Sequence, residues 1–264
     1  MTLKFCSFSS GSSGNCYLVK TETTAVLIDA GIGAARILSG LQRTRTATED
    51  VKAILLTHEH SDHVSGVSAT LSRLPQSKVC ANEDTLARVR ANIPEARRSL
   101  FDTGDAFRVG DIEIRTFALS HDAADPVGYC LRHGEKMIGV VTDTGVFTEA
   151  ILSETVDADL LVLEANHDIE MLRNGRYPSF LKQRIEGMYG HLSNVAAGAA
   201  ILDIMSMERK ARCFLLAHLS RDNNKPRLAE YTVANMLAEM DYYSGRDLYL
   251  KPLLRDRLSV LFEI

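Results

Sequence analysis

A cluster of histidines at residues 58–63 constrains this chain more than any other feature of the sequence. The cluster reads His-x-His-x-Asp-His and holds three of the chain's eight histidines. It follows an apolar stretch at 51–57 and precedes a stretch with helical spacing at 64–74, which predicts a loop between a strand and a helix. Side chains two positions apart on extended backbone point the same way, so His58 and His60 can bind one metal ion.

The other two members of the cluster, Asp62 and His63, indicate a second ion. Four ligands within six residues cannot converge on one tetrahedral ion without strain, so the spacing favours two adjacent cations. A solvated polar loop is the alternative interpretation. The concentration of histidines in one short segment argues against it.

The composition is that of an ordinary globular protein, with 45% apolar and 24% charged residues. A length of 264 residues is enough to bury a large core and predicts one α/β domain over residues 1–264. The net charge of −4 gives no general attraction for polyanions. Nucleic-acid binding would therefore require a local basic patch.

The cysteines and the N-terminus favour a cytoplasmic location. The cysteines are odd in number, scattered, and free of CxxC pairs, which indicates buried thiols in a reducing compartment. The N-terminus lacks the layout of a signal peptide, and no apolar run is long enough to cross a bilayer. We therefore expect a cytoplasmic protein without membrane association. The five cysteines are Cys6, Cys16, Cys80, Cys130 and Cys213.

Polar side chains follow several of the predicted strands. In sheets flanked by helices, functional groups gather where strands end, because neighbouring loops converge there. An aspartate at the end of a buried strand is costly unless it is hydrogen-bonded or near a cation, so Asp29 is a candidate support for a metal ligand. The chain divides coarsely into two strand-rich halves near residues 140–150. The strand-end residues are Asp29, His58, His121, Asp143 and His218.

This set of residues resembles the metallo-β-lactamase superfamily. The motif at 58–63, with a distal His121, Asp143 at a strand end and a late His218, is similar to that superfamily along the whole chain. In narrower detail, three segments resemble the YycJ (WalJ) group of small bacterial hydrolases, which is regarded as acting on DNA as a 5′-to-3′ exonuclease. They are Ser-Gly-Ser-Ser-Gly-Asn at 10–15, Glu-x-Asn-His-Asp at 164–168 and Gly-His-Leu-Ser-Asn at 190–194.

The resemblance implies the metallo-β-lactamase αβ/βα four-layer sandwich, an α/β fold with two central mixed sheets and helices on the outside. It also implies two divalent ions that share a water, whose pKa falls from about 15.7 to about 7 and so yields metal-bound hydroxide at neutral pH. Zinc suits such an imidazole-rich site, and manganese, iron or cobalt can occupy it too. The implied ligands are His58, His60 and His121 for one ion, Asp62, His63 and His218 for the other, and Asp143 as the bridge.

The segment at 190–194 indicates the substrate. Ser193 or Asn194 is a good N-cap, and the helix that follows would direct free N–H groups and a positive dipole toward the site, which favours a phosphate. His191 could donate a proton to a leaving alkoxide, as a similarly placed histidine is thought to do in phosphodiesterases of the superfamily. A structural role ahead of the helix is the alternative for His191. Asp62 and His191 are the catalytic candidates.

Several neighbouring residues have weaker interpretations. Asn166 and His167 could line the pocket or cap the preceding strand, and Glu59 is interpreted as a surface charge. The Gly-Ser segment at 9–15 is interpreted as a hairpin turn. Two basic groups could contact a phosphate backbone or only form a solvated face. They are Arg173, Arg176, Lys182 and Arg184, and separately Arg221, Lys225 and Arg227.

Three functions remain open at this stage. The first is a dinuclear-metal phosphodiesterase or nuclease acting on nucleic acid, with DNA favoured. The second is a hydrolase of a thioester, lactone or other small acyl substrate on the same metal centre, and the third is a binding protein with structural metals. The interval from Asp143 to His218 spans 218 − 143 = 75 positions, which leaves little room for the inserted domain of RNA-processing nucleases in the superfamily.

Overall fold

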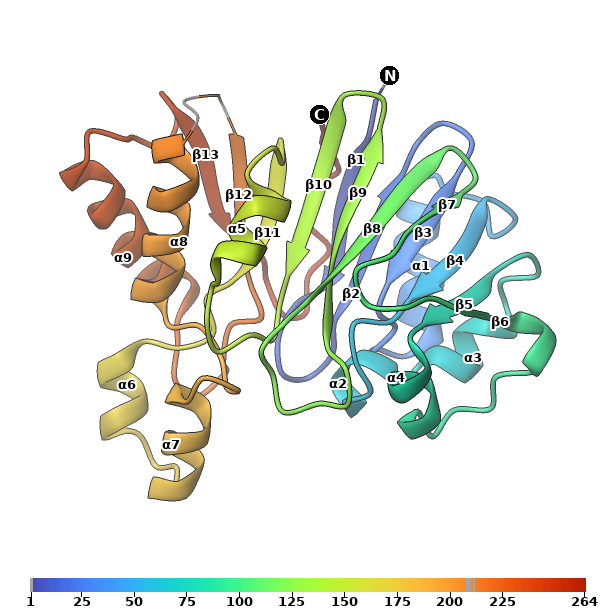
Figure 1. Cartoon of the computed structure of the whole chain (residues 1–264), viewed down its shortest axis with the longest axis horizontal. Coiled ribbons are helices and arrows are strands. Elements are labelled where there is room, and N and C mark those ends of the chain that lie inside the picture. The colour runs from blue at the N-terminus through green and yellow to red at the C-terminus, as the bar shows by residue number, and fades with distance from the viewer. Residues whose placement is uncertain (1, 208–209, 211) are drawn as a thin grey trace.

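Two mixed β-sheets of seven strands each form the centre of the protein (Figure 1). The computed structural model describes residues 2–207, 210 and 212–264. A buried apolar layer takes side chains from both sheets, among them Phe5, Tyr17 and Tyr129, and holds the sheets face to face. Burial of this layer removes the inner faces of both sheets from water, which is the main stabilising contribution to such a fold.

The first sheet has the strand order β14-β1-β2-β3-β4-β5-β6, in which β3 to β6 are parallel and the remaining pairs antiparallel. Its β3 consists of four fully buried apolar residues, as expected for a strand covered on both faces. The strands are β1 (Lys4–Ser9), β2 (Cys16–Lys20), β3 (Ala25–Ile28), β4 (Val51–Leu55), β5 (Lys78–Ala81), β6 (Arg98–Leu100) and β14 (Phe262–Glu263).

The second sheet has the order β13-β12-β11-β10-β9-β8-β7, with antiparallel pairs from β7 to β10 and parallel pairs from β10 to β13. Its strands are β7 (Ala106–Val109), β8 (Ile112–Ala118), β9 (Val127–His133), β10 (Lys136–Val141), β11 (Leu160–Glu164), β12 (Arg212–Ala217) and β13 (Leu248–Pro252). The strands β8, β10, β11 and β12 all run in one direction, so their carboxyl ends meet at one edge.

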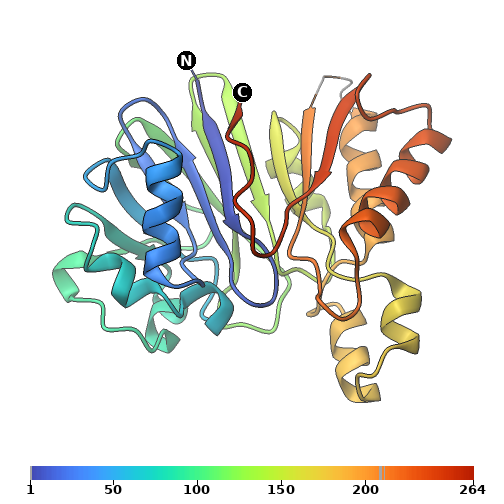
Figure 2. The same ribbon diagram turned by 180° about the vertical axis from the view of Figure 1, so that it is seen from behind.

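Helices cover the outer face of each sheet (Figures 1 and 2). The first sheet packs against α1 (Ala34–Arg43), α2 (Ser61–Val64), α3 (Val67–Leu71) and α4 (Glu83–Arg88), and a short 3-10 turn occupies Glu95–Arg97. The second packs against α5 (Glu149–Thr155), α8 (Asn194–Met207) and α9 (Pro226–Glu239). Two further helices, α6 (Ile169–Asn174) and α7 (Ser179–Glu186), extend beyond the sheets at the end where α2 lies (Figure 1).

This arrangement confirms the predicted four-layer sandwich, but the predicted division near residues 140–150 is wrong. The chain passes from the first sheet to the second between β6 and β7, and β14 near the C-terminus returns to pair with β1 (Figure 2). Tight turns such as Gly110-Asp111, where Gly110 has φ 58°, join β7 to β8. The hairpins that follow keep residues 106–141 in the second sheet.

The helix expected at 64–74 is interrupted at Ser65 and Gly66, which separate α2 from α3. The backbone N–H of Gly66 donates to the carbonyl oxygen of Ala30 at 2.8 Å. A Cβ at Gly66 would overlap the carbonyl oxygen of Ile32. The loop after β3 therefore occupies the space that a continuous helix would need.

The same loop packs tightly against the histidine motif. The N–H of Gly31 donates to the carbonyl oxygen of Asn15 at 2.8 Å, and the N–H of Asn15 donates to the carbonyl oxygen of Asp62 at 2.8 Å. A Cβ at Gly31 would overlap that same Asp62 carbonyl group. A side chain at this position would therefore push the motif out of place.

We expect Gly31→Ala to lower the free energy of unfolding by about 3 kcal/mol or more, because the overlap involves backbone on both sides. Gly33→Ala is the matched control. Gly33 has open space around its Cβ position and is the N-cap of α1, so its replacement should cost about 1 kcal/mol or less. Urea denaturation followed by circular dichroism measures both, and equal effects at the two positions would contradict the packing argument.

The five cysteines are free thiols, and four of them are buried. Burial raises the pKa of Cys130 to about 12, so this thiol is neutral at physiological pH. Within the part of the chain that the structure describes, no helix combines the length and the apolar character needed to span a bilayer.

Candidate metal centre

The predicted strand-end residues gather at one edge of the two sheets. Three of them have backbone in the left-handed region, with φ of 59° at Asp29, 62° at Asp143 and 53° at His218. This conformation costs residues with a Cβ roughly 1–2 kcal/mol. Such strain concentrates at functional sites, where the surrounding structure holds the residue in place.

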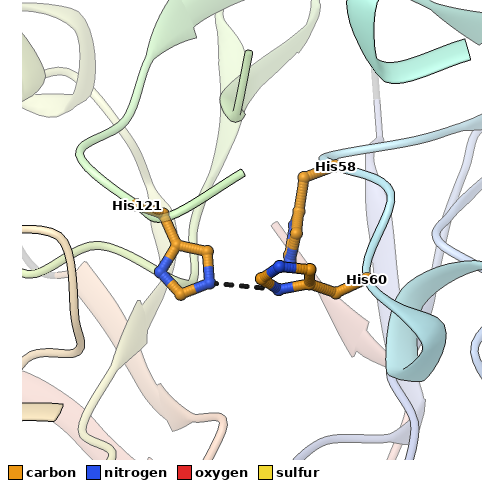
Figure 3. Close-up of side chains that lie close together, drawn as sticks. All are labelled: His58, His60 and His121. Atoms are coloured by element: carbon orange, nitrogen blue, oxygen red, sulfur yellow. Dashed lines mark hydrogen bonds between the residues drawn. The ribbon is translucent and has the colours of Figure 1, made fainter. Parts of the chain in front are cut away.

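A first group of imidazoles consists of His58, His60 and His121 (Figure 3). Each offers a ring nitrogen within 4.8 Å of the others. His60 Nδ1 and His121 Nε2 are 3.3 Å apart. His58 and His60 come from the loop after β4 and His121 from the loop after β8, so both sheets contribute to the group.

A second group consists of Asp62, His63 and His218. Asp62 Oδ2 lies 3.6 Å from His63 Nε2 and 3.4 Å from His218 Nε2. Asp62 is the second residue of α2, whereas His218 follows β12. Residues that are 156 positions apart in the chain therefore contribute to one site.

Asp143 lies between the two groups. Its Oδ2 is 3.3 Å from His63 Nε2, and its Oδ1 is 3.3 Å from His218 Nδ1 and 3.9 Å from His121 Nε2. The side chain is almost fully buried. Its carboxylate thus reaches ligand atoms of both groups, as a bridging carboxylate must.

The outer nitrogens of the histidines are held by acceptors. His63 Nδ1 donates to Asp29 Oδ2 at 2.7 Å, and His121 Nδ1 donates to the Gly190 carbonyl oxygen at 3.0 Å. His58 Nδ1 lies 3.0 Å from the hydroxyl of Thr57, which itself donates to Asp29. Hydrogen bonds of this kind fix the tautomer and leave the Nε2 lone pair for a metal.

Two buried atoms of the centre have no hydrogen-bond partner among the residues the structure describes. They are His58 Nε2 and Asp143 Oδ2. An unpaired buried polar atom costs about 1–3 kcal/mol, so each needs a reason to persist. Both atoms are metal-ligand types that face the clusters, and this donor set of imidazoles and carboxylates fits divalent cations.

A family model described as the beta-lactamase superfamily domain matches residues 24–218. The chain belongs to the metallo-β-lactamase superfamily. It is 38% identical to exodeoxyribonuclease YycJ of Bacillus anthracis over 248 residues, which cover 93% of each chain. It is 36% identical to exodeoxyribonuclease WalJ of Streptococcus pneumoniae over 266 residues, which cover 99% of this chain and 98% of WalJ.

These similarities confirm the resemblance to the YycJ (WalJ) group. The metallo-β-lactamase fold protein YhfI from Bacillus subtilis has a TM-score of 0.73 with this chain, at 14% identity, and the match covers 100% of this chain and 99% of YhfI. The match covers both sheets, so the whole fold of this chain is similar to that of YhfI.

Glu164 is a central residue of the candidate metal centre, although the sequence alone did not single it out as a site residue. It ends β11, is fully buried, and accepts from His191 Nδ1 and His218 Nδ1, both at 2.8 Å from its Oε1. Burial would raise the pKa of Glu164, but the two histidines hold it well below its usual range. Glu164 is therefore an anion that orients two imidazoles at once. Its place at the end of a strand, in line with the other site residues, was the available signal.

Two other residues make contacts that differ from their sequence interpretation. Asn15 Nδ2 lies 3.0 Å from His63 Nε2, so the segment at 9–15 reaches the metal centre and is more than a hairpin turn. Glu59 is not a free surface charge. Its carboxylate accepts from the N–H of Ala124 at 3.0 Å and lies 3.7 Å from Arg88.

The remaining candidates lie around His218 and the start of α8. Asn166 Nδ2 donates to the His218 carbonyl oxygen at 2.9 Å, whereas the Asn194 side chain pairs with Asn224 in the interior. Ser193 is the residue that caps α8, since its Oγ accepts from the N–H of Ala196 at 3.1 Å. Asn194 therefore has a structural pairing, and Ser193 faces the site side of the helix.

His191 lies beside the bridging position. Its Nδ1 is 3.7 Å from Asp143 Oδ1, and its side chain is 18% exposed, so it reaches both the centre and solvent. Burial alone would lower the pKa of His191, but the carboxylates of Glu164 and Asp143 raise it. The ring is thus held by Glu164 on one side and left accessible on the other.

In the first of the two basic groups, the three arginines are paired with carboxylates. Arg173 lies 3.0 Å from Glu186, Arg176 lies 2.6 Å from Asp222, and Arg184 pairs with Asp122. Lys182 donates to the Arg173 carbonyl oxygen at 2.7 Å. These pairs hold α6 and α7 together and against neighbouring loops, so their charge is partly neutralised.

Proposed function

We propose that this protein is a dinuclear-metal phosphodiesterase that degrades DNA as a 5′-to-3′ exonuclease. The structural observation that carries the proposal is the position of His191, whose Nδ1 lies 3.7 Å from the Asp143 carboxylate between the two ligand groups. A phosphodiester needs a proton for its leaving alkoxide, and His191 is placed to supply it. The near-full-length relatives named exodeoxyribonucleases support DNA as the substrate.

In this proposal three histidines bind one ion, an aspartate and two histidines bind the other, and a second aspartate binds both. Two divalent ions held there would supply a water of lowered pKa and would neutralise charge that develops on a phosphate oxygen. Zinc is proposed because imidazole and carboxylate ligands suit it, and manganese, iron and cobalt accept the same ligands. The sets are His58, His60 and His121, then Asp62, His63 and His218, with Asp143 shared.

Two side chains move protons in this proposal. His191 Nδ1 donates to Glu164, which leaves Nε2 to donate to the departing oxygen. Asp62 has a side chain that is 22% exposed. Its carboxylate lies 3.4 Å from His218 Nε2 and is the proposed acceptor for the proton of the attacking water. Asp29 and Asn166 act as positioning residues, because they contact the ring of His63 and the backbone of His218.

The proposal extends to the organisation and location of the protein. Residues 1–264 are proposed to act as a single domain, which the apolar layer shared by both sheets supports. A cytoplasmic location is proposed from the free cysteines, since reducing compartments keep thiols unpaired.

The decisive experiment uses the purified protein with its metal. Elemental analysis should give about two ions per chain, as expected for a two-metal site. A 5′-phosphorylated DNA duplex should be degraded, while a thioester and a lactone are not. Turnover of an acyl substrate with no attack on DNA would overturn the nuclease proposal and leave the fold and the metal centre intact.

We expect Glu164→Gln to lower DNA degradation or metal affinity about ten- to a hundredfold, the usual effect of losing a partner of a metal ligand. Glutamine keeps the shape of the side chain but removes the negative charge that His191 and His218 share. Activity assays and metal titration measure the effect. Glu154→Gln is the control, because Glu154 pairs with Arg115 away from the centre. Unchanged activity in Glu164→Gln would show that the shared carboxylate is dispensable.

A further inference from the structure

The loop between β1 and β2, rich in glycine and serine, lies beside the segment that joins β13 to β14 (Figure 2). Ser9 Oγ in this loop donates to the carbonyl oxygen of Arg255 in that segment. The loop also reaches the metal centre, because Asn15 Nδ2 lies 3.0 Å from His63 Nε2. The reaction derived above uses neither the serines at the tip of the loop nor the segment that they contact.

Arg255 is held against the tip of this loop. Its Nη1 donates to Ser12 Oγ at 3.2 Å and to Ser13 Oγ at 3.3 Å. Its Nη2 donates at 2.7 Å to the carbonyl oxygen of Leu219, one position after a candidate metal ligand. Gly11 permits this contact, because a Cβ there would lie 3.2 Å from both Arg255 Cζ and the Leu219 oxygen. Ser12, Ser13 and Arg255 form a group, the Arg255 cluster, that is fixed next to the metal centre.

The Arg255 cluster keeps hydrogen-bond donors available for a ligand. A guanidinium group has five N–H groups, and those not bonded to Ser12, Ser13 or Leu219 have no acceptor among the residues that the structure describes. Each serine oxygen accepts from Arg255, so each hydroxyl hydrogen stays free to donate. Both serines are exposed and Arg255 is partly exposed. A ligand can therefore reach these donors from solvent.

The positive charge of Arg255 is not matched by a carboxylate in contact with it. The nearby Asp256 carboxylate lies 3.4 Å from Arg36 and pairs with that side chain instead. Burial lowers the pKa of Arg255, the charge of Asp256 raises it, and the charge of Arg221 lowers it further. A partly buried cation that has only neutral hydrogen-bond acceptors is costly, and an anion at the cluster would reduce that cost.

Arg221 adds positive charge on the same side of the centre. It belongs to the second basic group of the sequence and is exposed. The carboxylate that follows it, Asp222, is bound instead by Arg176 at 2.6 Å and by the hydroxyl of Tyr177 at 2.9 Å. This part of the surface thus differs from α6 and α7, where the arginines are paired with carboxylates.

We infer that Ser12, Ser13 and Arg255 bind a backbone phosphate of the DNA strand that is cut, next to the phosphate attacked at the metal centre. The inference rests on the proposed function, because it extends the binding site of a DNA substrate. A phosphodiester offers two oxygens that share one charge, which a guanidinium group and hydroxyl groups bind through charge-assisted hydrogen bonds.

The position of the cluster favours an internal phosphate of that strand. Its donors face solvent and are not enclosed, so a strand can continue past them in both directions. Only the turn of the loop separates Ser13 from Asn15, which touches His63. The phosphate next along the cleaved strand is therefore the nearest one that the cluster can bind.

The test replaces single phosphates by methylphosphonate, which keeps the linkage but removes its charge. The metal-loaded enzyme acts on a 5′-phosphorylated duplex, and release of the first nucleotide is measured at low substrate. In wild type, one replacement near the cleaved linkage in the same strand should slow release about ten- to a hundredfold, the effect of losing hydrogen bonds to a charged group. In Ser12→Asp the new carboxylate should pair with Arg255, so that replacement should cost less than about threefold further.

Two variants control for the substitution itself. Ser12→Asn introduces a side chain of nearly the same size without charge, so it should raise the KM for DNA less than Ser12→Asp does. Ser153→Asp adds the same charge on the outer helix α5, where Ser153 is exposed and bonds to the Ala150 carbonyl oxygen. It should change the KM for DNA by less than about twofold.

The kinetic pattern separates binding from support of the metal centre. The effect of Ser12→Asp should appear in KM, with both ions still bound by elemental analysis. A fall in kcat and metal content instead, equal sensitivity of wild type and Ser12→Asp to every methylphosphonate, or coupling only to the complementary strand would overturn the inference while the nuclease function stands. Absence of any DNA degradation by wild type would overturn the proposed function and the inference with it.

Discussion

Asp143→Asn should reduce the metal content from about two ions per chain to one or none and lower DNA degradation roughly a thousandfold or more. The expected loss exceeds the ten- to hundredfold typical of residues that only support ligands. Asp143 reaches His63 of one group through Oδ2 and His121 of the other through Oδ1, so its replacement affects both ligand groups. Asparagine is nearly the same size but lacks the charge that draws two cations together.

Replacement of Asp143 by asparagine should leave the backbone conformation unchanged. Asp143 has φ 62°, and asparagine tolerates the left-handed region nearly as well as aspartate. Asp241 also has φ 62° and is exposed at the surface, so Asp241→Asn is a control for any effect of the substitution itself. Elemental analysis and a DNA assay on both variants measure the outcome. A variant of Asp143 that retained two ions would show that the carboxylate does not bridge them.

A comparison with His60→Ala tests the division of ligands between the two ions. His60 belongs only to the group with His58 and His121, so its loss should remove one ion and leave the other. Loss of both ions from His60→Ala would contradict the proposed division of ligands between the two ions.

The residues of the two candidate ligand groups could be selected from the sequence because several of them have a local signal. The spacing of His58 and His60 on extended backbone predicts convergence, and Asp143 and His218 follow apolar strands whose bounds are readable from composition. The strand β4 lies within the apolar stretch at 51–57, and β10 and β12 end shortly before Asp143 and His218.

Asp29 was a candidate support because it ends a buried strand, but Glu164 and Asn15 could not be found in the same way. Glu164 ends β11 just as Asp143 follows β10, but its function depends on contact with His191 and His218, which lie 27 and 54 positions away. Asn15 contacts His63 across 48 positions. A sequence pattern carries no information on such pairings when only one chain is known.

The predicted division near residues 140–150 and the predicted continuous helix at 64–74 were wrong for related reasons. Residues 64–74 have helical spacing, but the approach of the loop after β3 to Gly66 decides where the helix stops. The boundary between the sheets depends on the pairing of β8 with β9, which places β7 and β8 in the second sheet. In both cases contacts distant in sequence override the local preference.

His191→Ala should slow DNA degradation about a hundred- to ten-thousandfold, the range of general acid catalysis, while both metal ions remain bound. The histidine belongs to neither proposed ligand set, and its Nδ1 is held by Glu164 at 2.8 Å. Elemental analysis therefore has to accompany the assay. If His191→Ala lost a metal ion, His191 would have to be a metal ligand. The position of its ring near Asp143, Glu164 and His218 is compatible with that assignment.

A comparison of two substrates with different leaving groups tests the proton-donor role of His191 more sharply. The alkoxide released from DNA is a strong base and needs a proton, whereas p-nitrophenolate is stable as an anion at neutral pH. If His191 supplies that proton, His191→Ala should lose less than about tenfold on bis(p-nitrophenyl) phosphate while losing at least about a hundredfold on DNA. His133→Ala is the control, because the His133 ring lies at the turn at Asp111, outside both candidate ligand groups. Equal losses on both substrates would mean that His191 positions the phosphate or a neighbouring side chain, since an effect on proton transfer must depend on the basicity of the departing oxygen.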